Sequence, residues 1–188
     1  MEIRSAGRAA LAGFVGLVCA VLPAAEGRAA EPSYAGQEQR EIKALSADEV
    51  RALRAGEGMG LAKAAELNRY PGPRHVLDAA EALGLTAEQR AETERIYGQM
   101  HAEATALGQE ILALERELDT AFAQQTIRED ELARLTGALG ALQGRLRASH
   151  LRAHLQALAI LTAGQMERYR LVRGYAGPAG EAHHGHRP

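Results

Sequence analysis

The sequence contains a single cysteine, no tryptophan and only two phenylalanines, and its β-branched aliphatic residues are also few. Valine and isoleucine together supply 12 of the 188 residues, whereas alanine and leucine supply 39 and 24. Strands favour β-branched and aromatic side chains, while alanine and leucine are strong helix formers. The composition therefore argues against a β-sandwich, a barrel or a doubly wound sheet, and it predicts an all-α protein of one domain.

The lone cysteine and the small net charge each exclude classes of function. Because the cysteine is Cys19, a mature chain without its N-terminus can form no disulfide and can hold no zinc finger, iron–sulfur cluster, c-type haem or catalytic thiol. The formal net charge of −2 gives no basic footprint for nucleic acid. No nucleic-acid partner is therefore expected.

Residues 1–29 have the order of a secretory signal peptide. Arg4 and Arg8 form a basic start, residues 9–22 are almost wholly apolar or glycine, and small residues follow, which places the cleavage site near residue 27 or 29. The apolar run is shorter than the roughly 20 residues of a spanning helix, which favours cleavage over a membrane anchor. We therefore expect a protein exported to a bacterial periplasm, with no stable membrane anchor after cleavage.

The remaining chain divides into a polar lead-in, a helical domain and a tail. Residues 30–45 have no clear hydrophobic period and are expected to form a flexible lead-in. Capping signals and helical periodicity then mark one helical domain over 46–174. Residues 175–188 are rich in glycine, proline and histidine, and we expect them to form a disordered tail.

Three short helices are predicted in the first part of the helical domain. Residues 46–49, Ser-Ala-Asp-Glu, form a capping box that opens a helix running to residue 55. Two more short helices are expected at 60–68 and 74–83. The sequence Tyr-Pro-Gly-Pro at 70–73 lies between them as a turn that no helix can cross.

Two long amphipathic segments follow, from residue 86 to about 123 and from about 126 to 161. Capping boxes are expected at the start of each, at 86–89 and at 126–129. Their apolar positions recur at steps of 3, 4 and 7, at Ile96, Met100, Leu107, Ile111, Leu114, Leu118 and Phe122 and at Leu132, Leu135, Leu139, Leu142, Leu146, Leu151, Leu155 and Leu158. A short link predicts a long antiparallel helical hairpin with short flanking helices. Because one hairpin leaves much apolar surface uncovered, we expect a homodimer.

The pattern Leu-Thr-x-x-Gln occurs twice, at 85–89 and at 161–165, and each copy opens a helix. The matching residues are Leu85, Thr86, Gln89, Leu161, Thr162 and Gln165. Two such motifs flanking a helical hairpin behind a signal peptide resemble the LTxxQ family of bacterial envelope proteins. That family includes the Spy/CpxP chaperones and stress regulators and related zinc-resistance and heavy-metal-sensing proteins. The resemblance covers about residues 75–173.

The resemblance implies a dimeric cradle and two alternative functions. The first is an ATP-independent protein-folding chaperone of the envelope stress response, which binds unfolded or misfolded envelope proteins. The second is a periplasmic sensor or resistance protein that binds a heavy metal, with an inner-membrane sensor protein as a further partner. The cradle surface of the family carries basic residues beside apolar ones, whereas this chain has a slightly acidic net charge. Its arginines nevertheless gather near the second motif, at Arg145, Arg147, Arg152, Arg168, Arg170 and Arg173.

The histidines are the candidate metal ligands, because imidazole suits Zn, Cu and Ni. His183, His184 and His186 lie within four residues of the tail and could bind such an ion weakly or, as the alternative, form a solubilising tail. His150 and His154 share one helix face and could both reach one ion, but packing as neutral core residues is the favoured interpretation. His75 and His101 are isolated in the sequence and are interpreted as structural or exposed. No cofactor is required by this interpretation, and Zn, Cu or Ni is the candidate ion.

The sequence gives no case for an enzyme. No Ser/His/Asp arrangement can be recognised, and the glycine-rich segment 56–60 lacks the Lys-Ser/Thr of a phosphate-binding loop. Gly137, Gly140 and Gly144 form a strip of small residues in the second long helix. Glycine costs up to about 1 kcal/mol relative to alanine in a helix, so we interpret the strip as the place of a close helix crossing. The alternative is a deformable hairpin that adapts to clients. A binding protein of the chaperone type is the leading hypothesis, and a metal-binding protein is the alternative.

Overall fold

The computed structural model describes residues 34–175, and the chain divides into two units, Met1–Ala35 and Gly36–Pro188. The helices of the second unit are η1 (Gln37–Gln39), α1 (Ala47–Arg54), α2 (Lys63–Glu66), α3 (Pro73–Asp78), α4 (Ala80–Leu83), α5 (Ala87–Ala123), α6 (Glu129–Ile160) and α7 (Ala163–Val172). The described residues contain no strand, so the all-α prediction is confirmed. The expected signal peptide and the tail histidines lie outside them. No helix between residues 34 and 175 combines the length and apolar character needed to cross a membrane.

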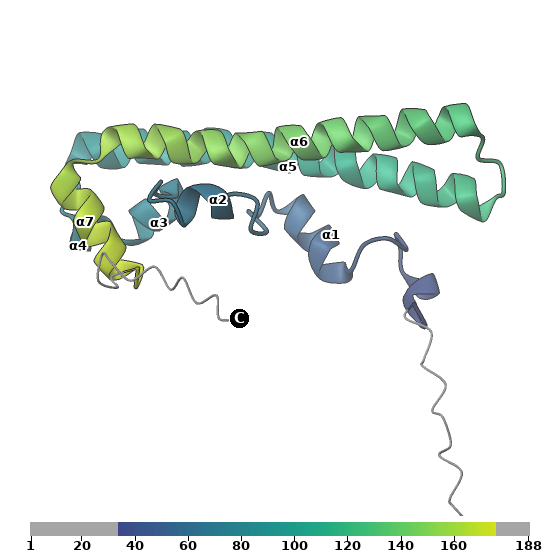
Figure 1. Ribbon diagram of the computed structural model, residues 1–188, viewed down its shortest axis with the longest axis horizontal. Helices are drawn as coiled ribbons and strands as arrows, with labels where there is room; N and C mark the ends of the chain where they lie inside the picture. The colour runs from purple at the N-terminus through teal and green to yellow at the C-terminus, as the bar shows by residue number, and fades with distance from the viewer. Residues whose placement is uncertain (1–33, 176–188) are drawn as a thin grey trace, which may run out of the picture. The chain divides into compact units, whose positions relative to one another are not determined.

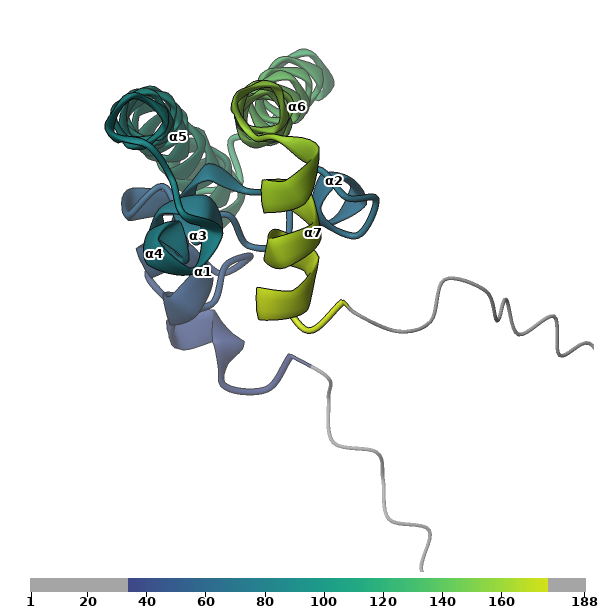
Figure 2. The same cartoon turned by 90° about the vertical axis from the view of Figure 1, so that its left-hand side faces the viewer.

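Helices α5 and α6 pack side by side as the predicted antiparallel hairpin, which Figure 1 shows from the side and Figure 2 along its axis. The apolar steps of 3 and 4 place one buried stripe of each helix against the other. The buried residues of this seam are Ala104, Leu107, Ile111, Leu112, Leu139, Leu142 and Leu146. In both views the short helices lie along one side of the pair, and α7 turns back to that side.

The link between the two long helices differs from its prediction. Helix α5 ends at Ala123, and Gln125 takes a left-handed conformation with a φ of 57°, which reverses the chain. The expected capping box at 126–129 is wrong, because Arg128 is the N-cap of α6 and makes no side-chain cap bond. The Thr126 hydroxyl instead donates to the carbonyl of Ala121. Acidic residues in the first turn of α6 interact favourably with the positive end of the helix dipole. This interaction stabilises the start of the helix, where no side-chain cap is formed.

The buried stripe of α6 changes direction halfway along the helix. Leu135, Leu139, Leu142 and Leu146 are buried as predicted and Leu132 is partly buried, but Leu155 is 58% exposed and does not continue the seam. The stripe passes instead through Ser149, His150, Ala153, His154 and Ala157. Small and imidazole side chains leave room there for the segment before α5, which packs onto this end of the hairpin. Helices α2 and α3 both contact α6 for this reason.

The segment before α2 covers the apolar face of the hairpin. Ile42 is 1% exposed, and it packs with Val50 and Leu53 of α1 against the seam. Part of the expected lead-in is therefore core. The tightest approach is at Gly108 of α5, where an added Cβ would lie 2.1 Å from the carbonyl oxygen of Leu53. A glycine is required at this position because any side chain would collide with the α1 backbone.

Two of the short helices differ from their predicted bounds. The helix expected at 60–68 is only Lys63–Glu66, since Gly60 has a φ of 78° and the backbone around it forms turns. The helix expected at 74–83 is broken at Ala79, where φ is −101° and ψ is 12°. The break lets α3 contact α5 and α6 while α4 contacts α7. Gly84 ends α4 in a left-handed conformation, as the sequence indicates.

The predicted close crossing at the glycine strip is wrong within the described residues. Gly137, Gly140 and Gly144 are all exposed, and an added Cβ at any of them would meet nothing within 4 Å. The helix phase explains this, because the strip lies on the face of α6 opposite the leucine seam. Gly108, on the other long helix, is the glycine at which another helix approaches most tightly.

Gly108→Ala is expected to destabilise the fold by about 1–3 kcal/mol, because its Cβ must displace the α1 backbone. Gly140→Ala, the matched control in an open position of α6, is expected to stabilise by about 0.5–1 kcal/mol. Urea unfolding of the two variants and the wild type measures both effects. Equal effects of the two substitutions would contradict the packing of α1 on Gly108.

Candidate functional site

Four histidines from three different helices line one cavity of about 460 Å³ beside the hairpin. His75 comes from α3, His101 from α5, and His150 and His154 from α6. Residues of the loop at 55–63 and of the turn at 72–74 line its other sides. Only 18 of the 142 described residues line this cavity, yet all four histidines between residues 34 and 175 are among them.

His150 is the most deeply buried of these histidines, at 4% exposure. Its Nε2 is inaccessible and has no hydrogen-bond partner among the described residues. Burial lowers the pKa of His150, and the nearby His154 and His101 lower it further. The imidazole is therefore kept neutral, and a buried polar atom is left without the partner that such atoms normally find.

The proton of His154 is placed by a hydrogen bond to the backbone. His154 Nδ1 lies 2.8 Å from the carbonyl oxygen of Tyr70. Because a carbonyl can only accept, Nδ1 must carry the hydrogen and donate it. In the neutral ring, Nε2 then keeps its lone pair and is free to act as an acceptor or a ligand. Histidines that bind metals commonly donate their second N–H to a carbonyl in this way.

Gly72 keeps the space between His154 and His75 open. A Cβ built on Gly72 would lie 3.0 Å from Cε1 and 3.2 Å from Nε2 of His154, and 3.5 Å from Cδ2 of His75. The φ of Gly72 is −78°, so its backbone does not require glycine. Space, not conformation, therefore explains a glycine here. Burial and the charge of Arg173 lower the pKa of His75, although Glu66 and Asp78 act in the opposite direction.

Glu66 ties the wall of the cavity to the C-terminal helix. Its carboxylate accepts hydrogen bonds from the Tyr169 hydroxyl at 2.8 and 3.0 Å, from Arg173 Nε at 3.1 Å and from the Tyr175 hydroxyl at 3.1 Å. The backbone N–H of Gly72 donates to it at 3.2 Å. Its Oε2 also lies 3.8 Å from Nδ1 of His154. One carboxylate therefore joins α2, α7 and the turn that opens α3.

The hydrogen bonds around Glu66 set its charge. Burial alone would raise the pKa of Glu66, but the bonds from Tyr169, Arg173 and Tyr175 outweigh burial, and its pKa lies below the ordinary 4.5. Burial and the neighbouring carboxylate raise the pKa of Tyr169, so its hydroxyl stays protonated and donates. Glu66 is thus a charged, hydrogen-bonded group in the lining of the cavity.

The structure shows where four of the seven histidines lie. His150 and His154 share one buried face of α6, as their spacing predicts. His75 and His101, interpreted from the sequence as structural or exposed, both line the same cavity, and His101 is exposed. His183, His184 and His186 lie outside the described residues. Between residues 34 and 175, no three His, Asp or Glu side chains are grouped so that they could hold a metal ion as they stand.

The two Leu-Thr-x-x-Gln motifs meet at the open end of the hairpin. Thr86 and Thr162 each cap their own helix in the expected capping box. Gln89 and Gln165 then bond to each other reciprocally, with Nε2 to Oε1 distances of 2.9 and 2.8 Å. Leu85 and Leu161 pack on one apolar cluster that includes Leu83 and Tyr169. The two motifs therefore join the starts of α5 and α7 next to the cavity, through the paired glutamines and the packed leucines. We call this contact the clasp.

Gln89→Ala and Gln165→Ala are expected to be non-additive, with an interaction free energy of at least about 0.5 kcal/mol, because each substitution removes both reciprocal bonds. Urea unfolding of the single and double variants measures the coupling. Ser46→Ala combined with Gln89→Ala is the control, since Ser46 caps the separate helix α1 and the two losses should add. Additive losses for the glutamine pair would contradict the clasp.

The stability that Glu66 provides is expected to depend on pH. Folding lowers its pKa below 4.5, so its contribution is fully present above that pH and is lost as pH falls through the folded value. The difference in free energy of unfolding between the wild type and Glu66→Gln should therefore shrink from about pH 6 to about pH 3. Urea unfolding over this range tests it. A difference that is constant with pH would show that the charge of Glu66 is not stabilised by its neighbours.

Comparisons with known proteins give no family assignment. No family model matches the chain, and no curated protein or solved structure matches it. The two motifs and the geometry of the cavity therefore carry the functional proposal.

Proposed function

We propose that the protein binds a transition-metal ion, of the kind Zn, Cu or Ni, in the histidine-lined cavity, and that it serves as a metal sensor or resistance protein of the periplasm. The observation that carries the proposal is the gathering of all four described histidines at one cavity, with the buried Nε2 of His150 unpartnered. Imidazole nitrogen is the common protein ligand for these ions.

Three further features of the cavity fit a metal. Metal binding requires neutral imidazole, and burial lowers the pKa of both His150 and His75. The bond from His154 to the Tyr70 carbonyl leaves the other ring nitrogen free. Gly72 leaves open the space that a side chain would fill between two of the rings. A small closure of the loop at 55–63 or of the rings would be needed, because no three-ligand group is assembled as it stands.

Binding of unfolded clients, the leading hypothesis from the sequence, has less support in the geometry. That hypothesis depended on an uncovered apolar stripe along the hairpin. Ile42 and α1 cover much of the stripe. The large apolar side chains that are more than half exposed on the long helices and α7 are Phe122, Leu155, Leu171 and Val172. We therefore place metal binding ahead of client binding.

The test uses the purified protein with His183, His184 and His186 all replaced by alanine, so that the tail cannot bind. Calorimetry with Zn(II), Cu(II), Ni(II) and, under reducing conditions, Cu(I) is expected to show that at least one ion binds. That ion should also raise the melting temperature, because the site exists only in the folded state. Gly72→Ala in the same background should weaken binding by about tenfold or more, since its Cβ fills the space beside His154. Gly140→Ala, an added methyl group on an open face, should leave the affinity unchanged.

Absence of binding of every ion by the tail variant would reject the proposal. Equal affinities of the Gly72→Ala and Gly140→Ala variants would place the metal elsewhere. Suppression of client aggregation by metal-free protein, together with no metal binding, would support the chaperone function instead.

A further inference from the structure

Methionines gather at the same cavity as the histidines. The described residues contain three methionines, and two of them, Met59 and Met100, line the cavity. The third, Met166, lies on α7 and does not line it. A thioether sulfur is a soft ligand, and two such groups stand beside four imidazoles in one cavity.

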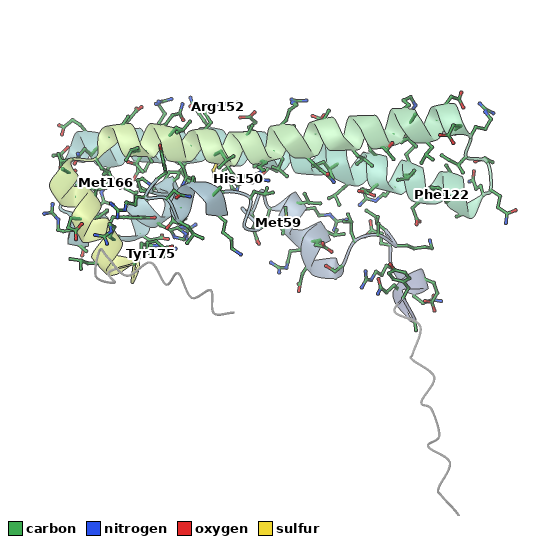
Figure 3. The ribbon with its side chains drawn as sticks, viewed as in Figure 1. Met59, Phe122, His150, Arg152, Met166 and Tyr175 are labelled. Atoms are coloured by element: carbon green, nitrogen blue, oxygen red, sulfur yellow. The ribbon has the colours of Figure 1, made fainter. Side chains whose placement is uncertain are left out.

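Met59 is held in an unusual way for an apolar residue. It is 44% exposed, and its φ of 42° lies in the left-handed region that side chains other than those of glycine, asparagine and aspartate seldom adopt. Gly60 follows with a φ of 78°. A Cβ built on Gly58 would lie 3.9 Å from Cε1 and Nδ1 of His150, so this loop runs along the His150 ring. Figure 3 shows Met59 on the loop beside the part of α6 that carries His150.

Packing alone does not account for this arrangement. Methionine commonly fills irregular gaps in a core, and Met100, which is partly buried on α5, could do so. Met59 buries too little of its side chain for that purpose. Its place in the lining of the cavity, on the loop beside the unpartnered, nine-tenths buried imidazole of His150, fits a ligand.

We propose that the ion bound in this cavity is Cu(I), held by imidazole nitrogen together with the thioether sulfur of Met59 and Met100. Soft thioether ligands select Cu(I), whereas Zn(II) and Ni(II) gain little from them. The proposal rests on the metal-binding function proposed above and names the ion for it. Copper enters as Cu(I) and no redox step is involved.

The experiment measures Cu(I) affinity by competition with the chromophoric chelator bicinchoninate, with ascorbate as reductant, and Zn(II) affinity by calorimetry. All variants carry the three tail histidines as alanine. Met59→Leu combined with Met100→Leu is expected to lower Cu(I) affinity by about tenfold or more and to change Zn(II) affinity by less than about twofold. Met166→Leu is the matched control and should change neither. X-ray absorption of the Cu(I) complex should show sulfur scattering that the double variant lacks.

The outcomes separate the two proposals. Zn(II) or Ni(II) binding at the cavity, with a Cu(I) affinity that the methionine substitutions leave unchanged, would overturn the copper assignment and keep the metal-binding function. An equal loss of Cu(I) and Zn(II) affinity in the double variant would also overturn it, because the methionines would then act on the shape of the site. Binding of no ion would overturn both. Circular dichroism and urea unfolding of the double variant show whether its fold is intact.

Discussion

The apolar seam between α5 and α6 is the contact on which the other parts of the described fold depend. It sets the two long helices antiparallel, so residues at equal distances from the link at 124–128 lie opposite each other. His101 and His150 are nearly the same distance from that link and therefore come to the same level of the hairpin. The seam also leaves one side of the pair apolar, and the segment from Ile42 to α4 must cover it. The cavity lies where this cover meets the end of the leucine stripe.

Two kinds of polar contact hold the end of the hairpin near the cavity. The reciprocal amides of Gln89 and Gln165 join the starts of α5 and α7, and each also serves its own helix cap. Glu66 gathers donors from Tyr169, Arg173 and Tyr175 on the other side. Such contacts stabilise only modestly, because they replace hydrogen bonds to water, but they are directional. Burial of leucine supplies the stability, and the polar groups set which residues face one another.

Much of this architecture could be predicted from the sequence, because it follows from local signals. Capping boxes fix the starts of three helices, at Ser46, Thr86 and Thr162. The periodic leucines from Leu135 to Leu146 fix the buried face of α6. The shift of the buried stripe of α6 to His150 and His154 could not be predicted from the sequence. It depends on the packing of α2 and α3 against α6 and not on the spacing of leucines. The same limit applies at Thr126, where the sequence matches a capping box but the geometry of the link places Arg128 at the N-cap and turns the Thr126 hydroxyl to the carbonyl of Ala121.

The candidate site was harder to predict than the fold because its residues come from four separate segments. His150 and His154 could be paired by their spacing, and the hairpin register could have added His101. Nothing local connects His75 or Glu66 to them, since only the path of the chain through the turn at 70–73 brings those residues close. A glycine at position 72 can be explained either by the backbone conformation of a turn or by the need for space beside a neighbouring group. Only the structure separates the two explanations, because it shows an ordinary φ and two histidine rings close to Gly72.

The exposed glycines of α6 have a consequence for motion. Gly137, Gly140 and Gly144 stand between the link at the far end of the hairpin and the half of α6 that carries the cavity histidines. Each leaves the helix backbone less strongly held than alanine would, by about 1 kcal/mol, and no neighbouring side chain supports it from outside. We therefore expect bending and amide hydrogen exchange in α6 to concentrate in this middle stretch. The far end of the hairpin would then change its direction without displacing the rings of His150 and His154.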